Sequence, residues 1–129
     1  MNEQSVLVVD DNPLNLELIS FVLESEGFVV STATDAESAK QILQESLPRL
    51  LVCDVQLPGI SGLDLIRMLR QSDRYNPMTI VVVTSYAMDN DRVTVMDAGC
   101  NEYFSKPIST RTFGPQIRAL LERTSLSKE

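Results

Sequence analysis

Short apolar runs alternate along the chain with longer stretches in which apolar residues recur every three or four positions. The short runs have the length and continuity of strands buried on both faces, and the longer stretches have the period of amphipathic helices. The runs predict strands at residues 6–9, 28–33, 50–53, 79–84 and 102–105. Because five strand–helix units follow one another, the pattern predicts an α/β fold, a doubly wound parallel sheet with helices on both faces.

Capping residues indicate where the predicted helices begin. Asn12 stands before Pro13, a residue that suits the first helical position, and Asp35 and Ser61 cap the next two helices. The start of the last helix is irregular, because Gly114–Pro115 falls within its first turns. Since proline cannot donate a backbone hydrogen bond, we expect a delayed start or a kink near residues 110–115.

Length and composition describe an ordinary globular domain. The 129 residues fit a single domain with a core at about residues 4–124 and a short polar C-terminal tail. The net charge of −7 argues against nucleic acid or an anionic membrane as a partner. No apolar run is long enough to span a membrane and no basic-then-apolar leader opens the chain, so we expect a cytoplasmic protein.

The chain contains no histidine and only two cysteines. The lack of histidine excludes a phosphohistidine, a Ser–His or Cys–His dyad and the usual zinc sites within this chain. Cys53 and Cys100 lack the CxxC spacing of metal or redox sites and are expected to be small buried side chains. Any chemistry must therefore depend on carboxylates, hydroxyls and lysine.

Polar residues stand at the carboxyl ends of four of the five predicted strands. Asp10 and Asp11 follow the first strand, Asp54 follows the third, Thr84 ends the fourth and Lys106 follows the fifth. Open α/β sheets bind their ligands at this edge. We therefore expect these five side chains to converge on one pocket, although each alone has an ordinary structural explanation.

The chemistry of this set points to phosphoryl transfer. Three carboxylates in one pocket repel one another and call for a cation, and oxygen ligands without histidine or thiolate favour Mg²⁺, with Mn²⁺ as a substitute. Lys106 adds a positive charge and Thr84 a hydroxyl donor. Together with a carboxylate nucleophile at Asp54, these groups describe a site that forms an aspartyl phosphate.

The segments around these residues also resemble a known family. VLVVDDN, LVCDVQLPGISGLDLI, VVVTSYA and DAGCNEYFSKPI are similar, in order and over essentially the whole chain, to the landmarks of two-component response-regulator receiver domains of the CheY-like superfamily. Within that family, DNPLN and GCNEYFSKPIS most resemble single-domain regulators of the DivK type and receivers attached to hybrid kinases. The resemblance implies a flavodoxin-like sheet of five strands in the order 2-1-3-4-5 with five helices.

The resemblance also implies a role for each site residue. Asp54 is the phosphoacceptor. Asp11 binds Mg²⁺ directly and Asp10 binds it through water, with Asp54 and the backbone carbonyl of Gln56 as further ligands. Lys106 pairs with the phosphoryl group, and the Lys106–Pro107 bond is expected to be cis.

A conformational switch is the second implication of the resemblance. Thr84 moves its hydroxyl onto the phosphate and Tyr103 rotates inward, while the backbone N–H groups of Val55 and Ser85 bind phosphoryl oxygens. Tyr86 stands at a position that varies in the family, and its bulk is expected to hinder attacking water and prolong the phosphorylated state.

A receiver domain implies particular partners. A histidine kinase or a histidine phosphotransfer protein donates the phosphoryl group, and a downstream protein target reads the switched state, with phosphorylation-dependent dimerisation left open. The domain then acts as a signalling phosphoacceptor that catalyses only its own phosphorylation and dephosphorylation.

Other functions remain open at the level of sequence. One alternative is a phosphorelay intermediate, or a receiver excised from a hybrid kinase, that passes the phosphoryl group on, although Met1 and the short polar tail favour a natural single-domain chain. A binding module that is never phosphorylated is a further alternative. A magnesium-dependent phosphatase is disfavoured because Gln56 stands where a second acid is needed. A flavin carrier is disfavoured because aspartates occupy the loop where its phosphate would bind.

Overall fold

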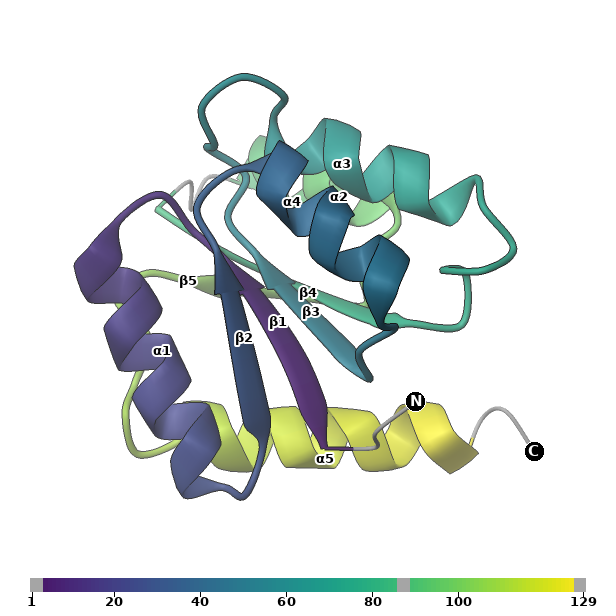
Figure 1. The fold of residues 1–129 in the computed structure, drawn as a ribbon. Coiled ribbons are helices and arrows are strands. Elements are labelled where there is room, and N and C mark those ends of the chain that lie inside the picture. Colours follow the sequence, from purple (N-terminus) through teal and green to yellow (C-terminus); the bar gives the residue numbers. More distant parts are fainter. Residues whose placement is uncertain (1–3, 86–88, 127–129) are drawn as a thin grey trace.

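The chain forms a central parallel sheet with helices on both of its faces (Figure 1). The computed structural model describes residues 4–85 and 89–126. The strands are β1 (Ser5–Val9), β2 (Val29–Ala33), β3 (Leu50–Cys53), β4 (Thr79–Thr84) and β5 (Glu102–Ser105). The helices are α1 (Pro13–Ser25), α2 (Ala36–Glu45), α3 (Gly62–Arg70), α4 (Asp89–Ala98) and α5 (Phe113–Leu126). The strands lie in the order β2-β1-β3-β4-β5 and every neighbouring pair is parallel, which confirms the predicted architecture.

The two faces of the sheet bury separate apolar layers. Helices α2, α3 and α4 cover one face and α1 and α5 cover the other, as Figure 1 shows. Successive residues of a strand point to opposite faces, so in β1 Leu7 and Val9 join the first layer while Val6 and Val8 join the second. Both faces are therefore dry, and this explains why the central strands are apolar without alternation.

The first three helices begin at the capping residues that the sequence indicated. The side chains of Asn12, Asp35 and Ser61 each accept a hydrogen bond from the N–H three residues further along the chain, at 3.3, 2.8 and 3.1 Å respectively. Each bond satisfies one of the donors that an α-helix leaves free at its N-terminus. Within the described residues, no helix has both the length and the apolar character needed to cross a membrane.

The last helix has the delayed start rather than a kink. It begins at Phe113 and contains both Gly114 and Pro115 in its first turn. Proline is tolerated there because the first N–H groups of a helix have no intrahelical acceptor. Directly after Pro115, the N–H of Gln116 donates an α-helical hydrogen bond to the carbonyl of Thr112, at 2.9 Å.

Arg70 connects the end of α3 to several other segments. Its Nε donates to the carbonyl of Gly99 and its Nη2 to Oδ1 of Asn101, each at 2.8 Å. Its Nη1 donates to the carbonyls of Asn76 and Met78, also at 2.8 Å. One side chain thus joins α3, the loop before β4 and the connection between α4 and β5.

Replacing this arginine should cost much of the domain's stability. Arg70→Ala leaves several partly buried carbonyls without a donor, so we expect the free energy of unfolding to fall by about 3 kcal/mol. Urea denaturation followed by circular dichroism measures the loss. The matched control is Arg67→Ala in the same helix, which removes only an exposed pair with Asp64 and should cost about 0.5 kcal/mol or less. Equal losses in the two variants would contradict the role given to Arg70.

Candidate functional site

The register of the sheet brings the polar strand-end residues to one edge. Pairing of β1 with β3 leaves Asp10 and Asp54 side by side, each one residue beyond a paired position. In the pairing of β4 with β5, Lys106 directly follows the residue opposite Thr84, and its N–H donates to the Thr84 carbonyl at 2.9 Å. The strand ends that carry these four residues therefore lie together at one edge of the sheet, as the sequence predicted.

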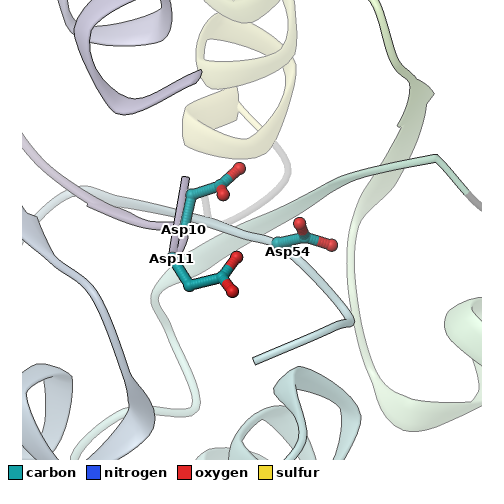
Figure 2. Close-up of side chains that lie close together, drawn as sticks. All are labelled: Asp10, Asp11 and Asp54. Carbon is teal, nitrogen blue, oxygen red and sulfur yellow. The ribbon is translucent and has the colours of Figure 1, made fainter. Parts of the chain in front are cut away.

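Three carboxylates gather at this edge, as Figure 2 shows. Asp10, Asp11 and Asp54 each offer a carboxylate oxygen, and these oxygens lie within 4.8 Å of one another. Asp10 and Asp54 retain only 1% and 6% of their accessible surface, whereas Asp11 is exposed. Two nearly buried carboxylates require partners, because an isolated buried charge is strongly unfavourable.

Lys106 supplies the positive charge for both buried carboxylates. Its Nζ lies 2.7 Å from Oδ2 of Asp10 and 2.7 Å from Oδ2 of Asp54. Burial alone lowers the pKa of Lys106, but the hydrogen bonds and charges of Asp10 and Asp54 outweigh burial and the net direction of the pKa is upward. The ammonium group therefore bridges the ends of β1 and β3.

The second oxygen of each buried carboxylate accepts a backbone hydrogen bond. The N–H of Asn12 donates to Oδ1 of Asp10 at 2.9 Å, and the N–H of Gln56 donates to Oδ1 of Asp54 at 3.0 Å. Neither donor was predicted from the sequence, in which Asn12 was expected to cap a helix and Gln56 to offer its carbonyl to the metal. Each donor is the N–H two residues after an aspartate, which is the spacing of an Asx turn. That spacing could have predicted both hydrogen bonds.

The donor set fits a hard divalent cation. All the candidate ligands are oxygens, and three carboxylates face a single lysine, so the cluster keeps an excess of two negative charges. Within the described part of the chain, the exposed carboxylate of Asp11 makes no hydrogen bond or ion pair. Asp11 is thus available to a cation of the Mg²⁺ type, which accepts carboxylate and water oxygens.

The two predicted switch residues lie on neighbouring strands. Thr84 is completely buried at the end of β4. Tyr103 on β5 is half-buried, packs against the apolar layer under α2, α3 and α4, and has its hydroxyl oxygen buried. The Lys106–Pro107 bond is cis, as the family resemblance implied. Tyr86 lies outside the described residues.

The family model of the response regulator receiver domain matches residues 6–118, which is most of the chain. The chain belongs to this receiver domain family. It is also 33% identical over 118 residues to the polar-differentiation response regulator DivK of Brucella anthropi, covering 92% of this chain and 96% of that protein. The receiver domain is thus part of the two-component signalling family that its motifs resemble.

Solved receiver structures share the fold. A putative response regulator from Chloroflexus aurantiacus superposes with a TM-score of 0.89 at 30% identity, covering 95% of this chain and all of that one. The receiver domain of a sensor histidine kinase from Pseudomonas aeruginosa superposes with a TM-score of 0.80 at 27% identity, covering 95% and 97%. That second structure has a magnesium ion coordinated in its active site cleft.

Both cysteines of the receiver domain are buried thiols, as the sequence predicted. Cys53 precedes the phosphoacceptor candidate, and its Sγ donates to the Asp54 carbonyl at 3.3 Å. Burial, followed by the charges of Asp54 and Asp10, raises the pKa of the Cys53 thiol well above its usual range. Burial and the nearby Glu102 raise the pKa of Cys100 to about 11. The thiols thus stay protonated and take no part in the charge balance of the cluster.

These raised pKa values make stability fall at alkaline pH. Above the ordinary thiol pKa of 9.0 the unfolded chain releases protons that the folded chain keeps, so the free energy of unfolding decreases as pH rises. We expect a slope of up to about 1.4 kcal/mol per pH unit from Cys53, with less from Cys100. Urea denaturation between pH 8 and pH 10 measures this slope, and Cys53→Ala should flatten it. The same slope in both proteins would contradict the prediction.

Proposed function

We propose that this receiver domain accepts a phosphoryl group on Asp54 and signals through a conformational switch to a protein partner. The donor is the phosphohistidine of a histidine kinase or a histidine phosphotransfer protein, and the reaction depends on Mg²⁺. The observation that carries this proposal is the bridge from Lys106 to Asp10 and Asp54 beside an exposed third carboxylate.

The family resemblance gives each carboxylate a role toward the metal. Asp10, which is almost completely buried, contacts Mg²⁺ through water in this proposal. Asp11 is available for direct binding, with Asp54 and the backbone carbonyl of Gln56 completing the protein ligands. When bound, Mg²⁺ or Mn²⁺ supplies charge neutralisation for the phosphoryl oxygens. The magnesium ion in the active site cleft of the Pseudomonas relative supports magnesium as the metal.

The chain's own residues perform the transfer. A carboxylate oxygen of Asp54 forms a bond to phosphorus while the P–N bond of the phosphohistidine breaks and its electron pair leaves on the imidazole nitrogen. Lys106 already contacts this carboxylate, so its charge can follow the phosphoryl group without rearrangement of the sheet. The backbone N–H groups of Val55 and Ser85 are the further donors that we assign to the phosphoryl oxygens.

The switch acts through the two residues on β4 and β5. A phosphoryl dianion on Asp54 attracts the Thr84 hydroxyl, and the space beside Thr84 is then filled by Tyr103. The position of Tyr103 on β5, the strand paired with β4, supports this role. A partner that binds one arrangement better than the other provides the output.

A cytoplasmic location belongs to the same proposal.

A protein donor needs a surface next to the acidic cluster. Helix α1 starts two residues after Asp11, and on it Leu14 and Phe21 remain 74% and 67% exposed. With Leu18, they line an open surface cavity of about 360 Å³. Exposed apolar side chains of this size beside a reactive pocket support contact with another protein.

Intact-mass measurement after incubation with acetyl phosphate tests the proposed function. We expect one phosphoryl adduct in the presence of Mg²⁺ and none after chelation with EDTA. Asp54→Asn should abolish the adduct, because an amide is a poor nucleophile for phosphorus. Asp64→Asn is the matched control, since Asp64 is an exposed residue on α3 whose carboxylate pairs with Arg67, and it should leave the adduct unchanged.

Two results would count against this function. An adduct that persists in Asp54→Asn would show that another residue accepts the phosphoryl group. Absence of any adduct in the wild type, at Mg²⁺ concentrations that other receivers need, would leave the alternative of a binding module that is never phosphorylated.

A further inference from the structure

Gly62 lies unusually close to the backbone of the phosphoacceptor. It is the first residue of α3 and is buried against the end of β3. A Cβ atom at this position would lie 2.0 Å from the carbonyl oxygen of Asp54, 2.9 Å from its carbonyl carbon and 3.0 Å from Cα of Val55. Since real Cβ atoms essentially never come within 3.0 Å of such atoms, only glycine fits here without a shift of about 1 Å or more.

The atoms on both sides of this contact are firmly held. The N–H of Gly62 donates to the carbonyl of Val55 at 2.9 Å, which closes the loop between β3 and α3 at its base. Behind Gly62, Leu65 and Ile66 of α3 are completely buried in the apolar layer. A side chain at position 62 therefore cannot be accommodated by moving a flexible group, and backbone must move.

The backbone that must move carries the reactive carboxylate. Asp54 is positioned by Lys106 at 2.7 Å and by the Gln56 N–H at 3.0 Å. Its carbonyl also accepts from the Cys53 thiol at 3.3 Å. A displacement of about 1 Å would stretch these bonds beyond hydrogen-bonding distance.

We infer that Gly62 is a positioning residue for the phosphoacceptor: its missing side chain lets α3 start against the Asp54 carbonyl and holds the Asp54 carboxylate toward Lys106. This inference rests on the proposed function, because it assigns Gly62 to the phosphorylation of Asp54. Helix propensity argues the other way, since alanine favours a helix more than glycine does. Tertiary contact, and not local conformation, therefore selects glycine at this position.

The same loop supplies a matched control. Gly59 has a φ of +76°, so alanine there is strained, but nothing lies within 4 Å of its Cβ position. Gly59→Ala thus disturbs the loop by backbone conformation alone, whereas Gly62→Ala disturbs it by contact with Asp54. A difference between the two variants isolates the contact.

The test compares the initial rates of phosphorylation by acetyl phosphate for wild type, Gly59→Ala and Gly62→Ala. The rates are measured at saturating Mg²⁺ and well below the melting temperature of each protein, with folding verified by circular dichroism. We expect a loss of roughly 100-fold for Gly62→Ala, the size of effect that a 1 Å misplacement of a reacting group can have. Gly59→Ala should stay within about threefold of wild type, because its Asp54 is not displaced.

Crystal structures of the two variants give a second measurement that does not depend on phosphorylation. In Gly62→Ala the distance from Lys106 Nζ to Asp54 Oδ2 should exceed 3.5 Å, and in Gly59→Ala it should remain near the 2.7 Å of the wild type. If Gly62→Ala is unfolded in buffer, all rates are measured in trimethylamine N-oxide, which favours compact states.

The outcomes separate this inference from the proposed function. If the wild type is phosphorylated and Gly62→Ala reacts as fast as Gly59→Ala, the positioning role is wrong while the proposed function stands. If the wild type is not phosphorylated, the proposed function fails, and the crystal structures alone decide whether Gly62 positions the carboxylate. An unchanged Lys106–Asp54 distance in Gly62→Ala overturns the inference in either case.

Discussion

The pair of contacts from Lys106 to Asp10 and Asp54 is the interaction on which the site depends. Each contact is 2.7 Å long, and the two carboxylates are almost completely buried. Without the ammonium group, the ends of β1 and β3 would hold neighbouring negative charges in a region of low dielectric constant, which is strongly unfavourable. With it, the cluster still has three carboxylates for one lysine, an excess of negative charge that favours a divalent cation. We propose that this residual charge recruits the Mg²⁺ ion on which phosphorylation of Asp54 depends.

The fold allows rigid and accessible groups to coexist at this edge. The buried carboxylates are fixed by the sheet register, by Lys106 and by one backbone N–H each. Asp11 is exposed at the start of the loop before α1, so a ligand can approach it without any opening of the domain. On the far side of Asp54, a Cβ atom at position 62 would lie 2.0 Å from the Asp54 carbonyl oxygen, so α3 starts close against this strand end only because the residue there is glycine. The Asp54 carboxylate is therefore fixed on its strand while Asp11 beside it remains accessible.

Much of the fold could be predicted from the sequence because its signals are local. Continuous apolar runs marked the buried strands, and β3, β4 and β5 have the predicted bounds. The positions of Asp10, Asp54, Thr84 and Lys106 relative to those runs were enough to predict their convergence. The strand order was also predicted correctly, but from the family resemblance and not from periodicity.

Other features depend on tertiary contacts that leave no local pattern. The network around Arg70 joins segments up to 31 residues apart, and nothing in the spacing of α3 distinguishes Arg70 from the exposed Arg67. The close approach of Gly62 to Asp54 is likewise visible only once β3 and α3 are placed together. At Pro115 the local rule was informative but incomplete: the missing N–H of proline allowed either a kink or a delayed helix start. The structure has the delayed start, with Pro115 in the first turn of α5.

Calorimetric titration of Mg²⁺ into the wild type and Asp11→Asn tests the role of the cluster most directly, because Asp11 is exposed and its replacement spares the contacts of Lys106. We expect one Mg²⁺ site in the wild type and an affinity at least about tenfold lower in Asp11→Asn, a difference of about 1.4 kcal/mol. Equal affinity in the two proteins, or no binding to the wild type, would contradict the claim that the residual negative charge of this cluster recruits the cation.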